Sequence, residues 1–452
     1  MKNTRYRILK KTRRILLCCI FVILTAFFYK HYDTNEYSVD NEQEYIDRIC
    51  EIAGVPALSV AVWDNENEVF LNYYNGENKV DENSLYELAS TSKAFTGLAM
   101  LQLQNNGLLS FDSPVEQYIP EFHPTYRGTE TQITIEQLLN HTSGIPSYAL
   151  DWIPEESFHA GGLSNSLSCL YDVKLLYEPG SKYNYSTVNY DLLALIVERI
   201  TGTGFENFVK INILDKVGMN NSFYRTDLIQ SDVVQGYKPA FFLACPYNAP
   251  VYYGNTAAGY LISDTYDLMK WLRNVNILFD FDSFPISSEN PYFAGWNIYD
   301  GYVCHGGNNP NYSSQVYVDR NEPLGVFVLS AKAGSSASTI GDALFRIHHG
   351  EKIKIGMYID FFEILDLLFV TVPLLVLYVI LWMPYDSKDK VIIRFIIGLV
   401  IILAFAAFLL VSPISYRYCV VWFPGSFIFF VNVMVIISIY LITRSILCLI
   451  KR

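Results

Sequence analysis

Apolar and polar residues alternate in two stretches of the chain. Residues 55–74 read "VPALSVAVWDNENEVFLNYY", with a polar turn in the middle, and residues 313–331 read "SSQVYVDRNEPLGVFVLSA", with "DRNE" between two apolar runs. A period of two places alternate side chains on opposite faces of a strand. Each stretch therefore predicts a β-hairpin.

Helical spacing predominates elsewhere between residues 89 and 350. Apolar residues recur at intervals of three and four in "TIEQLLNHTSG", "NYDLLALIVERITG", "SDTYDLMKWLRN" and "ASTIGDALFRIHHG", as they do along an amphipathic helix. A hairpin towards each end and a helix-rich middle predict one α/β domain. Its antiparallel sheet would be built from both ends of the segment and covered by helices.

Four apolar runs lie outside this domain. The first, residues 15–29, follows a segment with seven Lys and Arg in its fourteen residues, which is typical of an export signal. No small-x-small cleavage site follows, so an uncleaved anchor is favoured. The other runs cover residues 367–383, 395–411 and 418–442, and each approaches or exceeds the length that spans a bilayer.

These runs predict three parts: a signal anchor at 1–30, an exported domain at 31–355 and three transmembrane helices at 356–452. Lys388, Lys390 and Arg394 lie between the first two terminal runs. Because positive charge favours the cytoplasmic side, we expect residues 31–355 on the outer side of the cell membrane. The carboxylates Asp360, Glu363 and Asp366 could guide a cationic substrate or simply sit at the membrane interface.

Composition excludes some functions. The net charge is −12, which argues against a nucleic-acid partner, since phosphate backbones are bound by clustered Lys and Arg. The seven His and eight Cys show neither zinc spacing nor a dense disulfide pattern. We therefore expect no metal, no cofactor and at most one disulfide.

A candidate nucleophile stands at the start of the helical pattern "STSKAFTGLAMLQLQNNG". Ser90 precedes Lys93 by three positions, so both side chains share one helix face. A serine hydroxyl needs a base within hydrogen-bond reach, and a buried lysine near a helix N-terminus has a lowered pKa. Alone, this spacing more often marks a helix cap with a solvated lysine.

Two further stretches add to Ser90 and Lys93. In "PGSKYNYSTVNYDLLALIVERITG", Tyr185 precedes a long helix and could pass a proton to a leaving amine. In "HGGNNPNYSS", Gly306 and Gly307 follow His305 and leave room for a ligand to approach the strand.

These three stretches, in this order, resemble the serine β-lactamase and penicillin-binding protein superfamily, in particular its class C and D-aminopeptidase branch. "LLNHTSGIP" and "AAGYLIS" are further points of similarity, and the resemblance covers about residues 45–350. It implies a β-lactamase-like fold, an antiparallel sheet flanked by helices plus an all-helical region. It also implies Ser90 as nucleophile, Lys93 as base and Tyr185 as acid, with the N–H groups of Ser90 and Asn308 as oxyanion hole.

Two residues depart from the superfamily pattern. Thr187 stands where an asparagine is usual, and His305 stands where a lysine helps to hold a substrate carboxylate. Since a histidine is mostly neutral at pH 7, we expect free-carboxylate ligands to bind less well. Both departures weaken the β-lactamase and carboxypeptidase interpretations and leave acyl transfer intact.

A narrower resemblance is to the membrane-bound peptidases that mature colibactin-type prodrugs. It rests on "VPALSV", "YELASTSKAFTGL", "YSTVNYDLL", "HGGNNPNYSS" and the three terminal apolar runs. It implies removal of an N-acyl-D-asparagine cap, with Asn309 and Thr187 in the side-chain pocket. Asn255 replaces a histidine of that pocket, so the recognised side chain stays open.

The sequence thus favours an exported, membrane-anchored serine peptidase whose partners are an N-acylated peptide-like substrate, membrane lipid and a candidate prodrug exporter, with a homo-oligomer left open. Two alternatives remain: another hydrolase of the superfamily (a D-amino-acid peptidase, an esterase or a cell-wall DD-peptidase), and a receptor that is acylated without turnover. Asn308, Asn309 and Asn311 could also serve only to shape a turn.

Overall fold

The structure is a computed structural model that describes residues 2–65, 67–76, 79–155, 162–224, 233–381 and 388–450. The chain forms two compact units. The sheet unit comprises Glu36–Tyr237 and Pro246–Lys354, and the apolar unit comprises Met1–Asn35, Lys238–Cys245 and Ile355–Arg452. Residues 238–245, inside the range 31–355 that the sequence assigns to the hydrolase, therefore group with the apolar helices.

The sheet unit is built on one antiparallel sheet with the strand order β11-β12-β13-β14-β15-β2-β3. Its strands are β2 (Ala57–Asp64), β3 (Asn67–Tyr74), β11 (Tyr292–Phe293), β12 (Trp296–Ile298), β13 (Tyr302–Asn308), β14 (Ser313–Asp319) and β15 (Leu324–Ser330). The two hairpins predicted from alternation are confirmed as β2–β3 and β14–β15. β15 lies between β14 and β2, so the two ends of the segment share one sheet.

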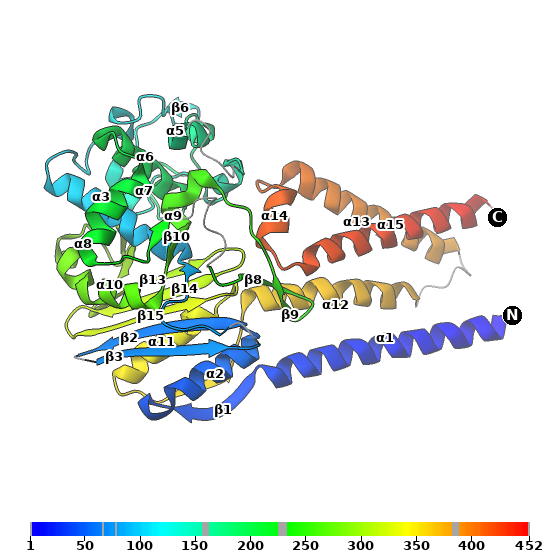
Figure 1. Ribbon diagram of the computed structural model, residues 1–452. Helices are drawn as coiled ribbons and strands as arrows, with labels where there is room; N and C mark the ends of the chain where they lie inside the picture. The colour runs from blue at the N-terminus through cyan, green and yellow to red at the C-terminus, as the bar shows by residue number, and fades with distance from the viewer. Residues whose placement is uncertain are drawn as a thin grey trace. The chain divides into compact units, whose positions relative to one another are not determined.

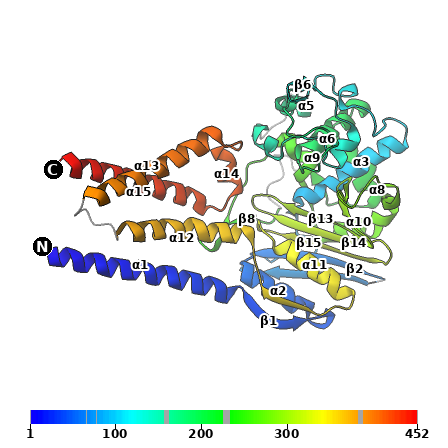
Figure 2. The same cartoon turned by 180° about the vertical axis from the view of Figure 1, so that it is seen from behind.

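Helices cover both faces of this sheet (Figures 1 and 2). α2 (Glu42–Ala53) and α11 (Ser336–His348) lie against one face, and α10 (Thr265–Leu278) lies against the other together with the helical region that holds α3 (Lys93–Asn105) and α6 (Val188–Thr201). Every residue of β15 is buried, as expected of a central strand covered on both faces. The predicted α/β fold class is confirmed.

Short elements complete the sheet unit. They are β4 (Tyr86–Glu87), η2 (Ala89–Ser92), β5 (Thr125–Tyr126), β6 (Thr129–Glu130), α4 (Ile135–Leu139), α5 (Gly162–Ser166), α7 (Phe205–Val209), α8 (Asp215–Val217), β7 (Phe223–Tyr224), η7 (Tyr253–Asn255), α9 (Thr256–Gly259) and β10 (Leu261–Ser263). β4, β10 and β7 form a small second sheet. β1 (Tyr32–Tyr37) pairs with β16 (Ile353–Met357), and the boundary between the two units falls within both strands.

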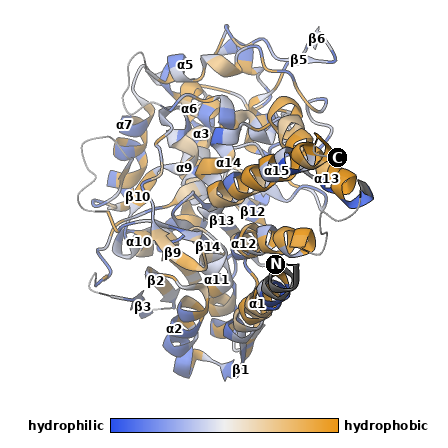
Figure 3. Cartoon of the chain, turned by 90° about the vertical axis from the view of Figure 1, so that its right-hand side faces the viewer, coloured by the Kyte–Doolittle hydropathy of each residue, from blue (hydrophilic) through white to orange (hydrophobic). Residues whose placement is uncertain are grey.

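The apolar unit contains α1 (Lys2–Lys30), β8 (Tyr237–Ala240), β9 (Leu243–Pro246), α12 (Phe361–Leu381), α13 (Lys388–Val411), α14 (Tyr416–Trp422) and α15 (Ser426–Ile450), although β8 and β9 each have one end residue in the sheet unit. Among the described residues, four segments are long and apolar enough to cross a membrane: Leu9–Lys30, Phe361–Leu381, Asp389–Val411 and Ser426–Ile450. Figure 3 shows the apolar colour concentrated on α12, α13 and α15. The expectation of three terminal apolar helices is confirmed.

One expectation about these helices was wrong. The run at 418–442 is not one helix, because α14 ends at Trp422 and α15 begins at Ser426. Pro424 lies between them, and proline has no N–H to continue a helical ladder. Residues 382 and 383 of the run at 367–383 lie outside the described residues.

Candidate active site

Ser90 lies in the single turn η2, directly before α3. The preceding residue, Ala89, has a left-handed backbone with φ of 49°, which is unusual for a residue with a side chain. The carbonyl of Leu88 accepts hydrogen bonds from Thr91 Oγ1 at 2.7 Å and Ser314 Oγ at 2.5 Å. The turn that carries Ser90 is therefore fastened to strand β14.

Lys93 is buried one turn after Ser90. Its ammonium group, Nζ, donates to Ser90 Oγ at 3.0 Å, to Thr187 Oγ1 at 2.9 Å and to the carbonyl of Ala258 at 2.8 Å. Its side chain is fully enclosed, and this burial lowers the pKa of Lys93 to about 7, while the carboxylate of Asp191 opposes the shift. At neutral pH a large fraction of Lys93 is thus an uncharged amine able to take a proton.

Tyr185 completes the group from the loop before α6. Burial raises the pKa of Tyr185, and the neighbouring Ser90 hydroxyl opposes the rise. Its ring lies 5.2 Å from Lys93 Nζ. The hydroxyl of Tyr185 therefore keeps its proton near neutral pH and can donate it.

Strand β13 approaches Ser90 at Gly307. A Cβ on Gly307 would lie 2.3 Å from Ser314 Oγ, 2.6 Å from the carbonyl of Leu88 and 2.9 Å from the backbone N of Ser90. Only glycine fits here, whereas a Cβ on Gly306 would meet only the amide end of Gln315, at 2.8 Å. The strand edge thus lies beside the N–H group expected in the oxyanion hole.

The two strand residues that flank this glycine pair differ in their contacts. His305 is buried, its Nε2 lies 3.0 Å from the hydroxyl of Tyr292, and burial together with Lys93 lowers its pKa to about 3. It is therefore neutral at pH 7, as expected. Asn308 pairs with Ser313 across the sheet, and its side-chain oxygen accepts the N–H of Gly334 at 3.1 Å.

The side-chain amides of Asn309 and Asn255 both lie beside Gly259. Both N–H groups of the Asn309 amide are used inside the chain, by Glu87 Oε2 at 2.9 Å and by the carbonyl of Gly259 at 3.0 Å. Asn255 Oδ1 accepts from Thr187 Oγ1 at 3.4 Å. The free ends, Asn309 Oδ1 and Asn255 Nδ2, each lie 3.5 Å from the point where a Cβ on Gly259 would stand.

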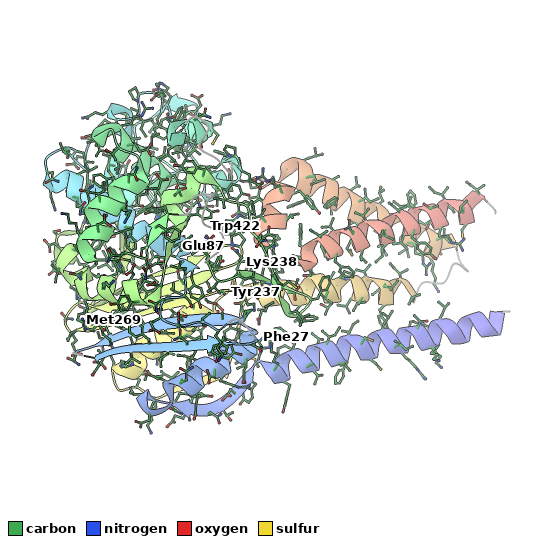
Figure 4. All side chains as sticks on the ribbon, in the orientation of Figure 1. Phe27, Glu87, Tyr237, Lys238, Met269 and Trp422 are labelled. Carbon is green, nitrogen blue, oxygen red and sulfur yellow. The ribbon has the colours of Figure 1, made fainter. Side chains whose placement is uncertain are left out.

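Sequence reasoning missed three buried residues around this group. Asp191, on the same face of α6 as Thr187 and one turn later, is fully buried near Lys93. Glu87, labelled in Figure 4, accepts a hydrogen bond from the side-chain amide of Asn309. His141 packs its ring against Tyr185, with centroids 4.2 Å apart. All three stand in quoted motifs, "NYDLL", "YELASTSKAFTGL" and "LLNHTSGIP", but only tertiary contacts show their role.

The structure therefore brings the predicted site residues together from five elements. Ser90, Lys93, Thr187 and Asn255 form one hydrogen-bonded chain, and the ring of Tyr185 lies beside Lys93. A hydroxyl beside an amine of pKa about 7, a phenol that keeps its proton and an adjacent strand edge can carry out acyl transfer.

Comparison with known proteins places most of the chain in one family. The profile of the family described as Beta-lactamase matches residues 43–351. Protein flp of Staphylococcus aureus (strain MW2) is 30% identical over 334 residues, which cover 64% of this chain and 63% of that protein. The match thus spans somewhat less than two thirds of the relative.

Solved structures share the fold. The octameric penicillin-binding protein homologue from Pyrococcus abyssi is 24% identical with a TM-score of 0.61, covering 70% of this chain and 78% of its own. A D-stereospecific amidohydrolase from Streptomyces sp. is 22% identical with a TM-score of 0.55, covering 68% of this chain and 97% of its own.

Proposed function

The chain belongs to the beta-lactamase family, and from that premise we propose that it is a membrane-anchored serine peptidase that removes an N-acyl-D-amino acid from a larger precursor. The proposed residue is D-asparagine. The precursor is a nonribosomal peptide or polyketide product, and cleavage frees its amine.

The observation that carries this proposal is the donor and acceptor pair above Gly259. The partners of the two amides fix their orientation: Asn309 Nδ2 faces a carboxylate and a carbonyl, which can only accept, so Asn309 Oδ1 is the end left over. Asn255 Oδ1 faces the Thr187 hydroxyl, whose own oxygen already accepts from Lys93. One donor and one acceptor are the complement of a primary carboxamide, which is the end group of asparagine.

Such a pair selects sharply. A carboxylate in the same place would bring two acceptors against Asn309 Oδ1 and would lack the N–H group. A buried polar group left unpaired costs more than a weak contact gains, so sites of this kind reject analogues strongly. We therefore propose Asn309, Asn255 and Thr187 as the group that holds the substrate side chain.

The proposed reaction has two stages. Lys93 takes the Ser90 proton while Oγ attacks the carbonyl, and the N–H groups of Ser90 and Asn308 stabilise the oxyanion. Tyr185 gives a proton to the leaving amine as the C–N bond breaks, and Lys93 restores that proton. Water, deprotonated by the same pair, then hydrolyses the ester and frees the N-acyl amino acid and Ser90.

Placement in the cell is part of the proposal. The four helices that are long and apolar enough to cross a membrane support this placement. We propose the cytoplasmic membrane, with the sheet unit outside, because the basic N-terminus and Lys388, Lys390 and Arg394 would then lie inside. An exporter of the precursor is the proposed partner.

The test uses membranes that contain the full chain, with N-myristoyl-D-asparaginyl, N-myristoyl-L-asparaginyl and N-myristoyl-D-aspartyl amides as substrates, each amidated at its α-carboxyl group. Mass spectrometry of the released amine should show cleavage of the D-asparagine compound only. Ser90→Ala should abolish it, and Ser338→Ala, an exposed serine on α11, should not.

Other results would decide against the proposal. Equal cleavage of D-aspartate would remove the role of the carboxamide pair. Cleavage of a simple ester or D-alanyl peptide alone would make the chain a hydrolase of another specificity. Stable acylation of Ser90 without turnover would identify a receptor.

A further inference from the structure

The hairpin β8–β9 in the apolar unit has an unusual turn. Its two turn residues, Phe241 and Phe242, have φ of 53° and 66°. Two consecutive left-handed residues define a turn for which Asn-Gly is preferred, and bulky side chains rarely adopt this backbone. Phenylalanine is therefore a poor choice for the turn itself. Its presence at both positions indicates that the two side chains have a role at the end of the hairpin.

The turn is held by a carboxylate from an apolar helix. Asp366 on α12 accepts the N–H of Phe241 at 3.0 Å and the N–H of Phe242 at 2.6 Å, and it also accepts the hydroxyl of Ser426 on α15. An acidic residue inside an apolar helix is costly unless it is fully paired. Asp366 therefore holds the hairpin turn. This role differs from the two that the sequence suggested, which were guiding a cationic substrate and lying at the membrane interface.

The base of the hairpin is fastened as well. Lys238 Nζ donates to the carbonyls of Val420 and Val421, at the end of α14, at 2.9 and 3.0 Å. The N–H of Gly425 donates to the carbonyl of Pro239 at 2.8 Å. Figure 4 labels Lys238 on the hairpin and Trp422 at the end of α14. The hairpin is thus a built part of the apolar unit rather than a loose loop.

The tip of this fastened hairpin remains uncovered. Phe241, Phe242 and Leu243 are 44%, 41% and 67% exposed. The ring of Phe241 contacts that of Phe429, at 5.4 Å between centroids, and Phe429 is itself 40% exposed. An apolar patch held rigidly in the open marks a contact surface.

The position of the hairpin turn along α12 and α15 indicates what it contacts. Asp366 is the sixth residue of α12, so it lies about 8 Å along the axis from the first residue, at 1.5 Å per residue. Phe429 lies in the first turn of α15. Both helices are candidate membrane spans, and Phe and Leu on the apolar face of an interfacial segment are buried at the boundary between headgroups and acyl chains.

We propose that Phe241, Phe242 and Leu243, called the hairpin tip, form a lipid-contact site that inserts into the bilayer at this level. The tip acts as an interfacial anchor in addition to the helices. Lys238 and Asp366 hold it in position from two sides. The site takes phospholipid, whatever the substrate of Ser90.

The test places a photoreactive phenylalanine analogue in the full chain, reconstituted in phospholipid nanodiscs. Position 242 is the first site, and position 243 is a second one outside the left-handed turn. Leu368 on α12, 46% exposed, is the positive control, and Tyr299 in the sheet unit, 42% exposed, is the matched negative control.

After irradiation, mass spectrometry should find phospholipid adducts at 242 and 243 within about threefold of those at 368, and at least about tenfold fewer at 299. Three outcomes would overturn the proposal. These are adducts to a second copy of the chain, as many lipid adducts at 299 as at 242, and no lipid adduct at 242 or 243 while 368 gives one.

Discussion

At the scale of single residues, the enclosure of Lys93 decides how Ser90 can react. Lys93 has three oxygen partners and no contact with solvent. An ammonium group in such a place loses its hydration, which favours the neutral amine. The same enclosure that prepares the base also ties it to Thr187, and through Thr187 to the proposed side-chain pocket.

This enclosure predicts a pH dependence. Since Lys93 has a pKa of about 7 and must be neutral to accept the Ser90 proton, kcat/KM should rise with pH, level off above about 7 and fall tenfold per unit below it. The charge of Asp191 raises the pKa of Lys93, while burial raises the pKa of Asp191 itself. Asp191→Asn removes this charge and should move the acid side of the profile to lower pH.

The measurement is the pH profile of kcat/KM with the D-asparagine substrate for the wild type and Asp191→Asn. Glu198→Gln is the control, because Glu198 lies on the same helix about two turns further and does not act on Lys93. An acid side that stays in place or moves to higher pH in Asp191→Asn would contradict the assigned coupling.

At the scale of elements, strand β13 and the turn η2 meet with no space between them. Gly307→Ala should reduce kcat/KM by about 10²-fold or more, because its Cβ would push the strand away from the Ser90 N–H and oxyanion donors have effects of this size. Gly306→Ala should stay near wild type, since the amide end of Gln315 can move aside. Equal effects of the two substitutions would show that the strand approach is unimportant.

Features that depend on local sequence could be predicted, whereas features that depend on tertiary contacts could not. The alternation in β2–β3 and β14–β15 is local, so both hairpins were predicted correctly. The spacing of Ser90 and Lys93 is local too, and their side-chain atoms lie 3.0 Å apart. Glu87 and Asp191 are carboxylates whose role exists only once Asn309 or Lys93 has packed beside them. The β8–β9 hairpin was missed because its Phe-Phe turn lacks the Asn and Gly that mark such turns.

At the scale of the whole molecule, the apolar helices should matter most for substrates that enter the membrane. A myristoyl chain partitions into lipid at about 0.8 kcal/mol per CH₂, so a membrane-anchored enzyme encounters it at a higher local concentration. A chain of residues 31–354, which lacks all four candidate spans, should therefore lose more of its cleavage of N-myristoyl-D-asparaginyl amide in vesicles than of its cleavage of the N-acetyl counterpart. Equal losses, with the fold checked by circular dichroism, would contradict this.

The docking of the hairpin by a distant helix also has a consequence for biosynthesis. Asp366 follows Phe242 by 124 residues, and at about 5–20 residues per second a ribosome needs roughly 6–25 s to make that segment. Ser426 follows Asp366 by a further 60 residues. Until Asp366 has been made, the turn N–H groups of the new hairpin therefore lack this carboxylate as their acceptor. The apolar unit can be completed only after translation has nearly finished.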